Sequence, residues 1–223
     1  MGATETGTSQ HRRRRGAYAK TEATRQAILD AALEVFAQGG YRAGSLREVA
    51  RRVGMSEAGL LHHFRNKVAL LEAVLEHRDD RNRDMVPVGQ GDPAATLRGL
   101  VRLAAHNAAN PGVVELYCTL SAEATSPDHP AHAYFTRRYD YTREVIERAF
   151  RSLADEGRLK QDMTPARAAV TIIAMMDGLQ VQWLYDRDVL DMAAELRALF
   201  EPFVDIDWDV EADGAVLAGE QTA

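Results

Sequence analysis

The stretch SLREVARRVGMSEAGLLHHF, residues 45–64, contains two short apolar helical patterns separated by a glycine. Ser45 and Ser56 each precede one pattern, and serine is a preferred helix N-cap because its hydroxyl accepts a hydrogen bond from an unpaired backbone N–H. Gly54 supplies the positive φ at which many helices end. The sequence therefore predicts two short helices joined by a turn of about three residues, which is the arrangement of a helix-turn-helix.

The spacing within the first pattern supports this prediction. Glu48 lies three residues after Ser45, which predicts a capping box where each side chain bonds the other residue's backbone N–H. Ala50 suits a point where two helices pack closely, and Leu60 and Phe64 are the predicted core residues of the second helix. In a helix-turn-helix protein the second helix enters the major groove of DNA. A plain helical hairpin would use the same glycine and caps, so the pattern alone leaves both interpretations open.

The charge distribution favours DNA binding by the N-terminal part alone. The whole chain carries a net charge of −6, with 27 Lys and Arg against 33 Asp and Glu. Residues 1–67 hold 12 of the basic and 6 of the acidic residues, so their net charge is +6 and that of residues 68–223 is −12. A basic N-terminal part on an acidic body indicates that only the former meets a polyanion.

Composition and helical periodicity divide the chain into four parts. We expect a disordered basic arm over 1–19, a helix-turn-helix domain over 20–66, a helical domain over 67–204, and a flexible acidic tail over 205–223. The arm contains HRRRRG at 11–16. This run is either a minor-groove or phosphate contact or an unstructured charged segment.

The body reads as helices throughout, and no segment shows sustained period-two alternation of β-branched residues. The predicted fold class is therefore all-α, with an N-terminal three-helix bundle that contains the helix-turn-helix and a C-terminal helical domain. The expected helices of the body lie near 94–109, 112–124, 131–156, 165–186 and 190–203.

Several other classes of protein are not expected. The chain has no run of eighteen apolar residues, so we expect no membrane span. Cys118 is the single cysteine, which excludes an internal disulfide and suits a reducing, cytoplasmic location. We predict no catalytic residues, no metal site and no cofactor, because no acid–base or metal-ligating groups stand at convincing spacing.

The stretch AILDAALEVFAQGGYRAGSLREVARRVGMSEAGLLHHFRNKVALLEAVL resembles the N-terminal domain of the tetracycline-repressor (TetR) family of transcriptional regulators. The shared motifs are Ala32 to Tyr41, Ser45 to Ser56, Leu60 to Phe64, and Lys67 to Leu70. One position departs from the family pattern, since Leu61 stands where the family usually has a tyrosine that reaches a DNA phosphate.

The resemblance implies that Ser45, Ser56, His62 and Lys67 hold phosphates. Leu61 is left to contact a thymine methyl or a sugar, and Arg47 is placed to reach a phosphate or a guanine edge. Glu57 either accepts a hydrogen bond from a cytosine amine or stabilises the helix N-terminus. The predicted DNA-binding residues are Ser45, Arg47, Ser56, Glu57, Ala58, Gly59, Leu61, His62 and Lys67.

The resemblance also implies a homodimer, in which 131–156 and 165–186 pair with their symmetry mates as a four-helix bundle. Both segments have apolar residues on more than one face, which fits one face on the core and another on a partner chain. Two copies are needed because one short helix gives too little sequence discrimination. The predicted interface residues are Ile146, Phe150, Ala174, Gly178 and Val181.

The family commonly binds a small effector in the body. The resemblance therefore implies that the helical domain over 67–204 serves for effector binding and dimerisation, and we expect a small apolar or amphipathic ligand there. Candidate cavity residues are Tyr117, Phe135, Tyr139, Met175 and Met176, and ordinary core packing explains each of them equally well. Asp177 lies inside an apolar stretch and needs a partner. A structural partner is favoured for it over a ligand amine.

The leading hypothesis is a sequence-specific DNA-binding regulator, a repressor released from a pseudo-palindromic operator by a small molecule. Its partners would be double-stranded DNA, a second copy of the chain and the ligand. The alternatives are a DNA-binding regulator without an effector and, last, a small all-helical enzyme.

Overall fold

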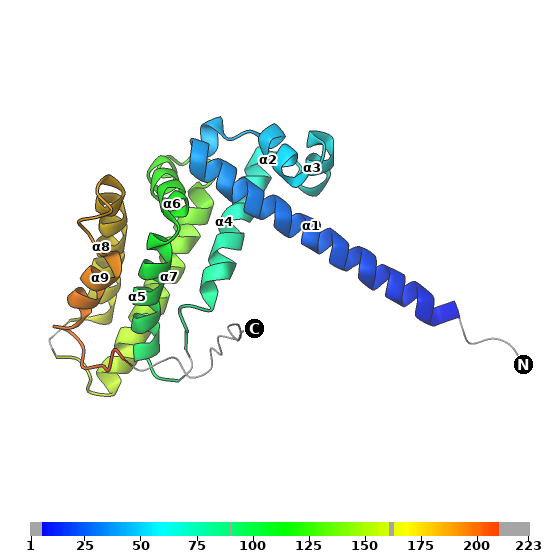
Figure 1. The fold of residues 1–223 in the computed structure, drawn as a ribbon. Coiled ribbons are helices and arrows are strands. Elements are labelled where there is room, and N and C mark those ends of the chain that lie inside the picture. Colours follow the sequence, from blue (N-terminus) through cyan, green and yellow to red (C-terminus); the bar gives the residue numbers. More distant parts are fainter. Residues whose placement is uncertain (1–5, 90, 161–162, 210–223) are drawn as a thin grey trace, which may run out of the picture. The chain divides into compact units, whose positions relative to one another are not determined.

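The computed structural model of the chain describes residues 6–89, 91–160 and 163–209 (Figure 1). These residues form helices and connecting turns, with one isolated antiparallel bridge between Leu159 and Val204 and no β-strand. The predicted all-α fold class is confirmed. The helices are α1 (Thr6–Ala43), α2 (Leu46–Val53), α3 (Glu57–His63), α4 (Lys67–Arg83), α5 (Ala94–Ala108), α6 (Pro111–Glu123), α7 (His132–Asp155), α8 (Pro165–Tyr185) and α9 (Met192–Phe200).

Backbone contacts divide the described residues into two compact units. The first unit contains the chain up to Arg81 together with Asn110–Thr136. The second contains Asn82–Ala109 together with the chain from Arg137 onward. The compact units therefore differ from the predicted division at residue 66, since most of α4 and all of α6 belong with the N-terminal helices.

The core of the first unit forms around α1, which packs against both α2 and α6. The apolar face of α1 is buried, and the side chains of Ile28, Ala32 and Phe36 are fully inaccessible to solvent. Burying an aliphatic or aromatic side chain of this size contributes about 1.5–3 kcal/mol. Near its end α1 is interrupted at Gly40, where φ is 70° and ψ is 169°.

The basic N-terminal arm is not disordered where the structure describes it. Helix α1 begins at Thr6, so the backbone of residues 6–19 is helical and the predicted disorder is wrong for this segment. Arginine, alanine and glutamine are good helix formers, and the glycines at positions 7 and 16 cost only about 1 kcal/mol each. The polar composition that suggested disorder is thus compatible with a helix that continues α1. Residues 1–5 of the predicted arm lie outside the described residues.

The second unit contains α5, most of α7, α8 and α9, with α9 packed against both α5 and α8. Its buried apolar side chains come from every one of these helices, as the predicted periodicity requires. The fully or almost fully buried examples are Leu97, Ile146, Phe150, Leu153, Ala169, Leu196 and Phe200.

A charged cluster at the start of α5 ties distant parts of the second unit together. Arg98 is 6% exposed, and its Nη2 atom donates to Asp92 Oδ2 at 2.7 Å. Arg158 Nη1 donates to the other Asp92 oxygen at 2.7 Å. Arg98 Nη1 also donates to the backbone carbonyl of Asp207 at 2.8 Å. Because a buried guanidinium needs a charged partner, this arrangement holds the beginning, middle and end of the unit in one place.

The first residues of the predicted flexible tail are ordered. The Asp205 N–H donates to the Arg158 carbonyl at 2.8 Å, and the ring of Trp208 stacks on that of Phe200 with centroids 5.8 Å apart. The predicted mobility is therefore wrong for residues 205–209, because backbone pairing and one aromatic side chain offset the acidic composition. Residues 210–223 lie outside the described part of the chain.

We predict that Asp92→Asn lowers the free energy of unfolding by about 1–3 kcal/mol at pH 7, because Arg98 would lose its charged partner. Burial alone raises the pKa of Asp92, but hydrogen bonds from Arg98, Arg158 and the Ala94 N–H outweigh burial and hold this pKa below its ordinary value. A carboxylate with a lowered folded-state pKa stabilises the fold above about pH 4 and stops doing so as pH falls through the folded-state pKa.

Urea denaturation over a pH series measures this effect, with Glu144→Gln on the exposed surface of α7 as the control. The difference between the wild type and Asp92→Asn should shrink as pH falls below about 4. A difference that is the same at pH 3 and pH 7 contradicts the assigned role of Asp92.

Candidate nucleic-acid interface

Helices α2 and α3 form the helix-turn-helix that the sequence predicts (Figure 1). The Ser45 hydroxyl caps α2 by accepting from the Arg47 N–H at 3.2 Å. The Ser56 hydroxyl caps α3 by accepting from the Gly59 N–H at 3.1 Å. Each helix begins where the sequence placed its serine cap, so both predicted starts are confirmed.

The turn between the helices depends on Gly54. Its backbone lies in the left-handed region, with φ 74° and ψ 31°. The following Met55 N–H then donates back to the Ala50 carbonyl at 2.9 Å, which completes the hydrogen bonding of the last turn of α2. Ala50 itself is 2% exposed. A small buried residue and a left-handed glycine together allow the two helices to meet at this corner.

The predicted capping box is not formed, although Ser45 still caps α2. The Ser45 hydroxyl accepts from the Arg47 N–H in place of the Glu48 N–H, and the carboxylate of Glu48 binds arginines instead of the backbone. Arg51 donates to both Glu48 oxygens at 2.7 and 2.8 Å, and Arg52 donates to one of them at 3.0 Å. Hydrogen bonds from Arg51, and then from Arg52, lower the pKa of Glu48 to about 2. The spacing of three and four residues on one helix was a signal for this pairing.

Arg52 also fastens α2 to α1. Its guanidinium donates to Glu34 at 3.0 Å and to Gln38 at 2.6 Å. Neither contact was predicted, since the partners are 14 and 18 residues away in the sequence. Arg52 therefore positions the helix-turn-helix on the unit and is less free than Arg47 to meet another molecule.

The predicted DNA-binding residues lie on the outer side of this motif. Leu60 and Phe64 of α3 and its cap are 0% and 4% exposed, so they anchor the helix in the core. Leu61, between them, is 39% exposed. The exposed predicted residues are Ser45, Arg47, Ser56, Glu57, Ala58, Leu61 and His62, whereas Gly59 and Lys67 are half-buried.

Two cations near the motif lie over aromatic rings. Lys67 Nζ is 4.6 Å from the centroid of Tyr41, and burial lowers the pKa of Lys67 from its ordinary value. The Arg25 guanidinium is 4.5 Å from the centroid of Phe64. Cation–π contacts of this kind hold the charge beside the aromatic ring. Arg25 was not predicted as part of the interface, and no local pattern marks it.

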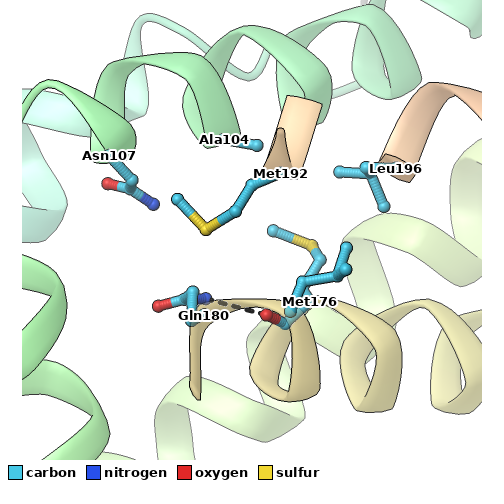
Figure 2. A pocket seen from close by; sticks show the side chains of 7 residues that line it. Ala104, Asn107, Met176, Gln180, Met192 and Leu196 are labelled. Atoms are coloured by element: carbon cyan, nitrogen blue, oxygen red, sulfur yellow. Dashed lines mark hydrogen bonds between the residues drawn. The ribbon is translucent and has the colours of Figure 1, made fainter. Parts of the chain in front are cut away.

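The five predicted effector residues do not gather in one described site. Tyr117 and Phe135 are buried in the first unit with ring centroids 5.3 Å apart. Tyr139, Met175 and Met176 belong to the second unit. Of these, Met176 lines a pocket between α5, α8 and α9 (Figure 2).

Asp177 has a structural partner in its own unit. The Tyr139 hydroxyl donates to Asp177 Oδ2 at 2.7 Å. Burial raises the pKa of Asp177, and the Tyr139 hydrogen bond and the charge of Arg138 only partly oppose this. The favoured interpretation of Asp177 as a structurally paired acid thus fits the observed geometry.

The predicted dimer residues separate into two groups. Ile146 and Phe150 are 0% and 1% exposed within the single chain, so their assignment to an interface is wrong. They fill the core of the second unit, and the periodicity of α7 could not distinguish that core from a partner chain. Ala174 is exposed, Val181 is 46% exposed and Gly178 is half-buried, all on α8.

Comparison with known proteins identifies the family. The family model described as "Bacterial regulatory proteins, tetR family" matches residues 28–74. A second model, "BetI-type transcriptional repressor, C-terminal", matches residues 93–206, which is more than half of the chain. The chain belongs to the tetR family of bacterial regulatory proteins.

Individual relatives agree with this assignment. The HTH-type transcriptional regulator AcrR of Shigella flexneri is 24% identical over 189 residues, covering 80% of this chain and 86% of AcrR. A TetR-family structure from Rhodococcus sp. is 25% identical with a TM-score of 0.64, covering 82% of this chain and 98% of that one. A regulator from Saccharomonospora viridis in complex with choline is 22% identical with a TM-score of 0.69, covering 83% and 100%.

Membership establishes the general function of the chain as a DNA-binding transcriptional regulator with a helix-turn-helix. The first family match covers α1 from Ile28 onward, all of α2 and α3, and the first half of α4. The second covers α5 to α9. In the described part of this tetR-family chain, no helix is long and apolar enough to cross a membrane.

We predict that Gly54→Ala destabilises this tetR-family regulator by about 1–2 kcal/mol, the cost of a left-handed backbone for a residue with a Cβ atom. An added Cβ would have no heavy atom within 4 Å, so the loss isolates backbone strain from steric overlap. Urea denaturation measures it.

Gly59→Ala is the matched control, because Gly59 lies inside α3 and an added Cβ would meet Ser56 Oγ at 3.4 Å, an ordinary contact. Alanine is a better helix former than glycine by about 1 kcal/mol, so this variant should be at least as stable as the wild type. Equal stability of Gly54→Ala and the wild type would show that the turn does not depend on the left-handed residue.

Proposed function

We propose that the chain is a dimeric repressor that reads a pseudo-palindromic operator with α3 and is released from it by a small molecule. The main support for this proposal is the exposure of α3. Leu60 of α3 and its cap residue Phe64 are buried, whereas the other face of the helix is in solvent beside basic side chains. A helix presented in this way fits the major groove, whose base-pair edges differ for each base pair.

The proposed contacts divide by their chemistry. Ser45, Ser56, His62 and Lys67 would hold phosphates, which sets the orientation of the protein without reading sequence. Ala58 and Gly59 have almost no side chain, so the backbone of α3 can approach the groove closely. Glu57 is the proposed acceptor for a cytosine amine or stabiliser of the α3 N-terminus.

Dimerisation is proposed through the outer face of α8. Val170, Val181 and Tyr185 are 58%, 46% and 90% exposed, and Ala174 is also exposed on this helix. Small and apolar residues on an exposed helical face allow close packing against a copy of the same helix. A specific operator must be bound about 4–10 kcal/mol more tightly than other DNA, and a wrong base pair costs about 1–3 kcal/mol. Two recognition helices reach that requirement more easily than one.

The proposed effector response rests on the body of the protein. The structurally similar regulator from Saccharomonospora viridis was crystallised with choline, so a protein of this fold holds a small molecule. In this chain the ligand would favour one arrangement of the paired DNA-binding units, with a coupling of about 1–3 kcal/mol. A regulator without an effector is the second candidate, and DNA affinity that no small molecule changes would favour it. We also propose that the protein acts in the cytoplasm by binding alone, without catalysis.

We predict that Arg47→Ala weakens binding to an operator selected from random DNA pools. If Arg47 meets a phosphate, the slope of log affinity against log salt concentration should decrease by about 0.9. If it meets a guanine edge, preference at one base pair should fall by about 1–3 kcal/mol. Fluorescence anisotropy over a salt series separates the two results.

Arg151→Ala provides the control, since Arg151 lies on α7 and pairs with Glu147 at 2.6 Å. This variant should bind operator as the wild type does. Unchanged slope and unchanged preference in Arg47→Ala would remove Arg47 from the interface, and a wild type that ignores every duplex at low salt would contradict the proposed function.

For the dimer we predict that Val181→Glu produces monomers in analytical ultracentrifugation and loses operator affinity, because pairing would bury two added carboxylates without partners. Val189→Glu is the control, as Val189 is 81% exposed but lies outside the helices, between α8 and α9. A Val181→Glu protein that stays dimeric would contradict the placement of the interface on α8.

A further inference from the structure

Arg25 of α1 places a positive charge beside the C-terminal end of the recognition helix. Its guanidinium carbon is 4.5 Å from the ring centroid of Phe64, the residue that caps α3. Phe64 is only 4% exposed, so the ring is a fixed surface beside the guanidinium. An arginine side chain carries several N–H donors, and Arg25 makes no hydrogen bond or ion pair with another residue in the described part of the chain.

A second arginine at this end of α3 is also unpaired. Arg65 directly follows Phe64, is exposed, and makes no hydrogen bond or ion pair with any residue that the structure describes. Arg51 and Arg52 of α2, by contrast, share the carboxylate of Glu48. Ion pairing therefore neutralises the arginines of α2 and leaves the charge at the end of α3 available to a phosphate.

The length of α3 matches the width of the groove that it is proposed to enter. Its seven residues make a helix about 10 Å long, whereas the major groove of B-DNA is about 12 Å wide. In a helix-turn-helix the N-terminal residues of the recognition helix contact base edges. The C-terminal end of α3 then lies near the phosphates that border the groove. Arg25, Arg65 and Lys67, which begins α4, all belong to this end.

The chemistry and position of Arg25 favour a phosphate over a base edge. The planar guanidinium of arginine can donate two parallel hydrogen bonds to phosphate oxygens. Arg25 is half-buried on α1, whereas Arg47 is exposed on α2, so Arg25 is less able to extend into a groove. A side chain already restricted by its neighbours also loses less conformational entropy when it binds.

We propose that Arg25 is a DNA-binding residue that holds a phosphate of the operator at the border of the groove next to the C-terminal end of α3. Because the same guanidinium contacts the ring of Phe64, the bound phosphate is fixed relative to the residue that anchors α3 in the core. Arg25 thereby sets how the recognition helix is placed along the groove. The inference rests on the proposed function, since it requires that α3 enters the groove.

A salt series on two variants tests the charge of Arg25. Arg25→Gln removes this charge and Arg25→Lys keeps it, and fluorescence anisotropy measures binding to an operator duplex selected from random DNA pools. Arg25→Gln should bind about tenfold more weakly at low salt. Its slope of log affinity against log salt concentration should decrease by about 0.9 for each chain in contact with the duplex. Arg25→Lys should keep the slope of the wild type.

A scan with neutral phosphates separates a phosphate contact from a structural effect on α3. Each duplex carries an uncharged methylphosphonate at one position, placed equivalently in both half-sites. At one position on the border of the groove the wild type should lose about tenfold in affinity. Arg25→Gln should lose nothing further at that position and should respond like the wild type at the others. A loss of packing against Phe64 would instead weaken binding to every duplex by the same factor.

Arg102→Gln is the control, because Arg102 is an exposed arginine on α5, outside the helix-turn-helix. It should keep the affinity and the slope of the wild type. An Arg25→Gln protein that keeps the wild-type slope, or that is weakened equally on every duplex of the scan, would overturn the inference and leave the proposed function standing. A wild type that binds no duplex at low salt would contradict both.

Discussion

A recognition helix of seven residues is far too short to be stable by its own backbone hydrogen bonds, because isolated helices below about 12 residues are marginal in water. Its existence depends on the burial of Leu60 and Phe64 in the core of the first unit. The exposed residues of α3 therefore keep their positions because these two side chains on its inner side are buried. The left-handed Gly54 and the serine cap set the direction of this helix, and Arg52 links the preceding helix to α1.

The helix-turn-helix was largely predictable because its determinants are local. A serine cap, a positive-φ glycine and a three-to-four residue apolar spacing act within a few residues, so they can be read in order along the chain. The partners of Arg52 and the contact between Arg25 and Phe64 join residues 14 to 39 positions apart. No pattern in a single sequence gives such pairings, since many other side chains could have met there.

In the body, the helix boundaries could be predicted from the sequence, whereas the roles of the apolar faces could not. The helices of the second unit begin and end close to the expected positions, because proline, glycine and periodicity mark them. The role of each apolar face was harder to assign. Ile146 and Phe150 are core residues although their stripe resembled an interface, since periodicity identifies an apolar face without identifying what covers it. Composition likewise failed for residues 205–209, where backbone pairing and Trp208 outweigh acidic character.

Helix α8 combines an inward face that lines a pocket with an outward face that stays in solvent. Met176 and Gln180 are four residues apart on the first face, and Ala174 and Val181 are seven apart on the second. Because these sets of positions do not overlap, substitutions can accumulate on one face of α8 without changing the side chains on the other. The two faces of this helix can therefore diverge independently within one lineage.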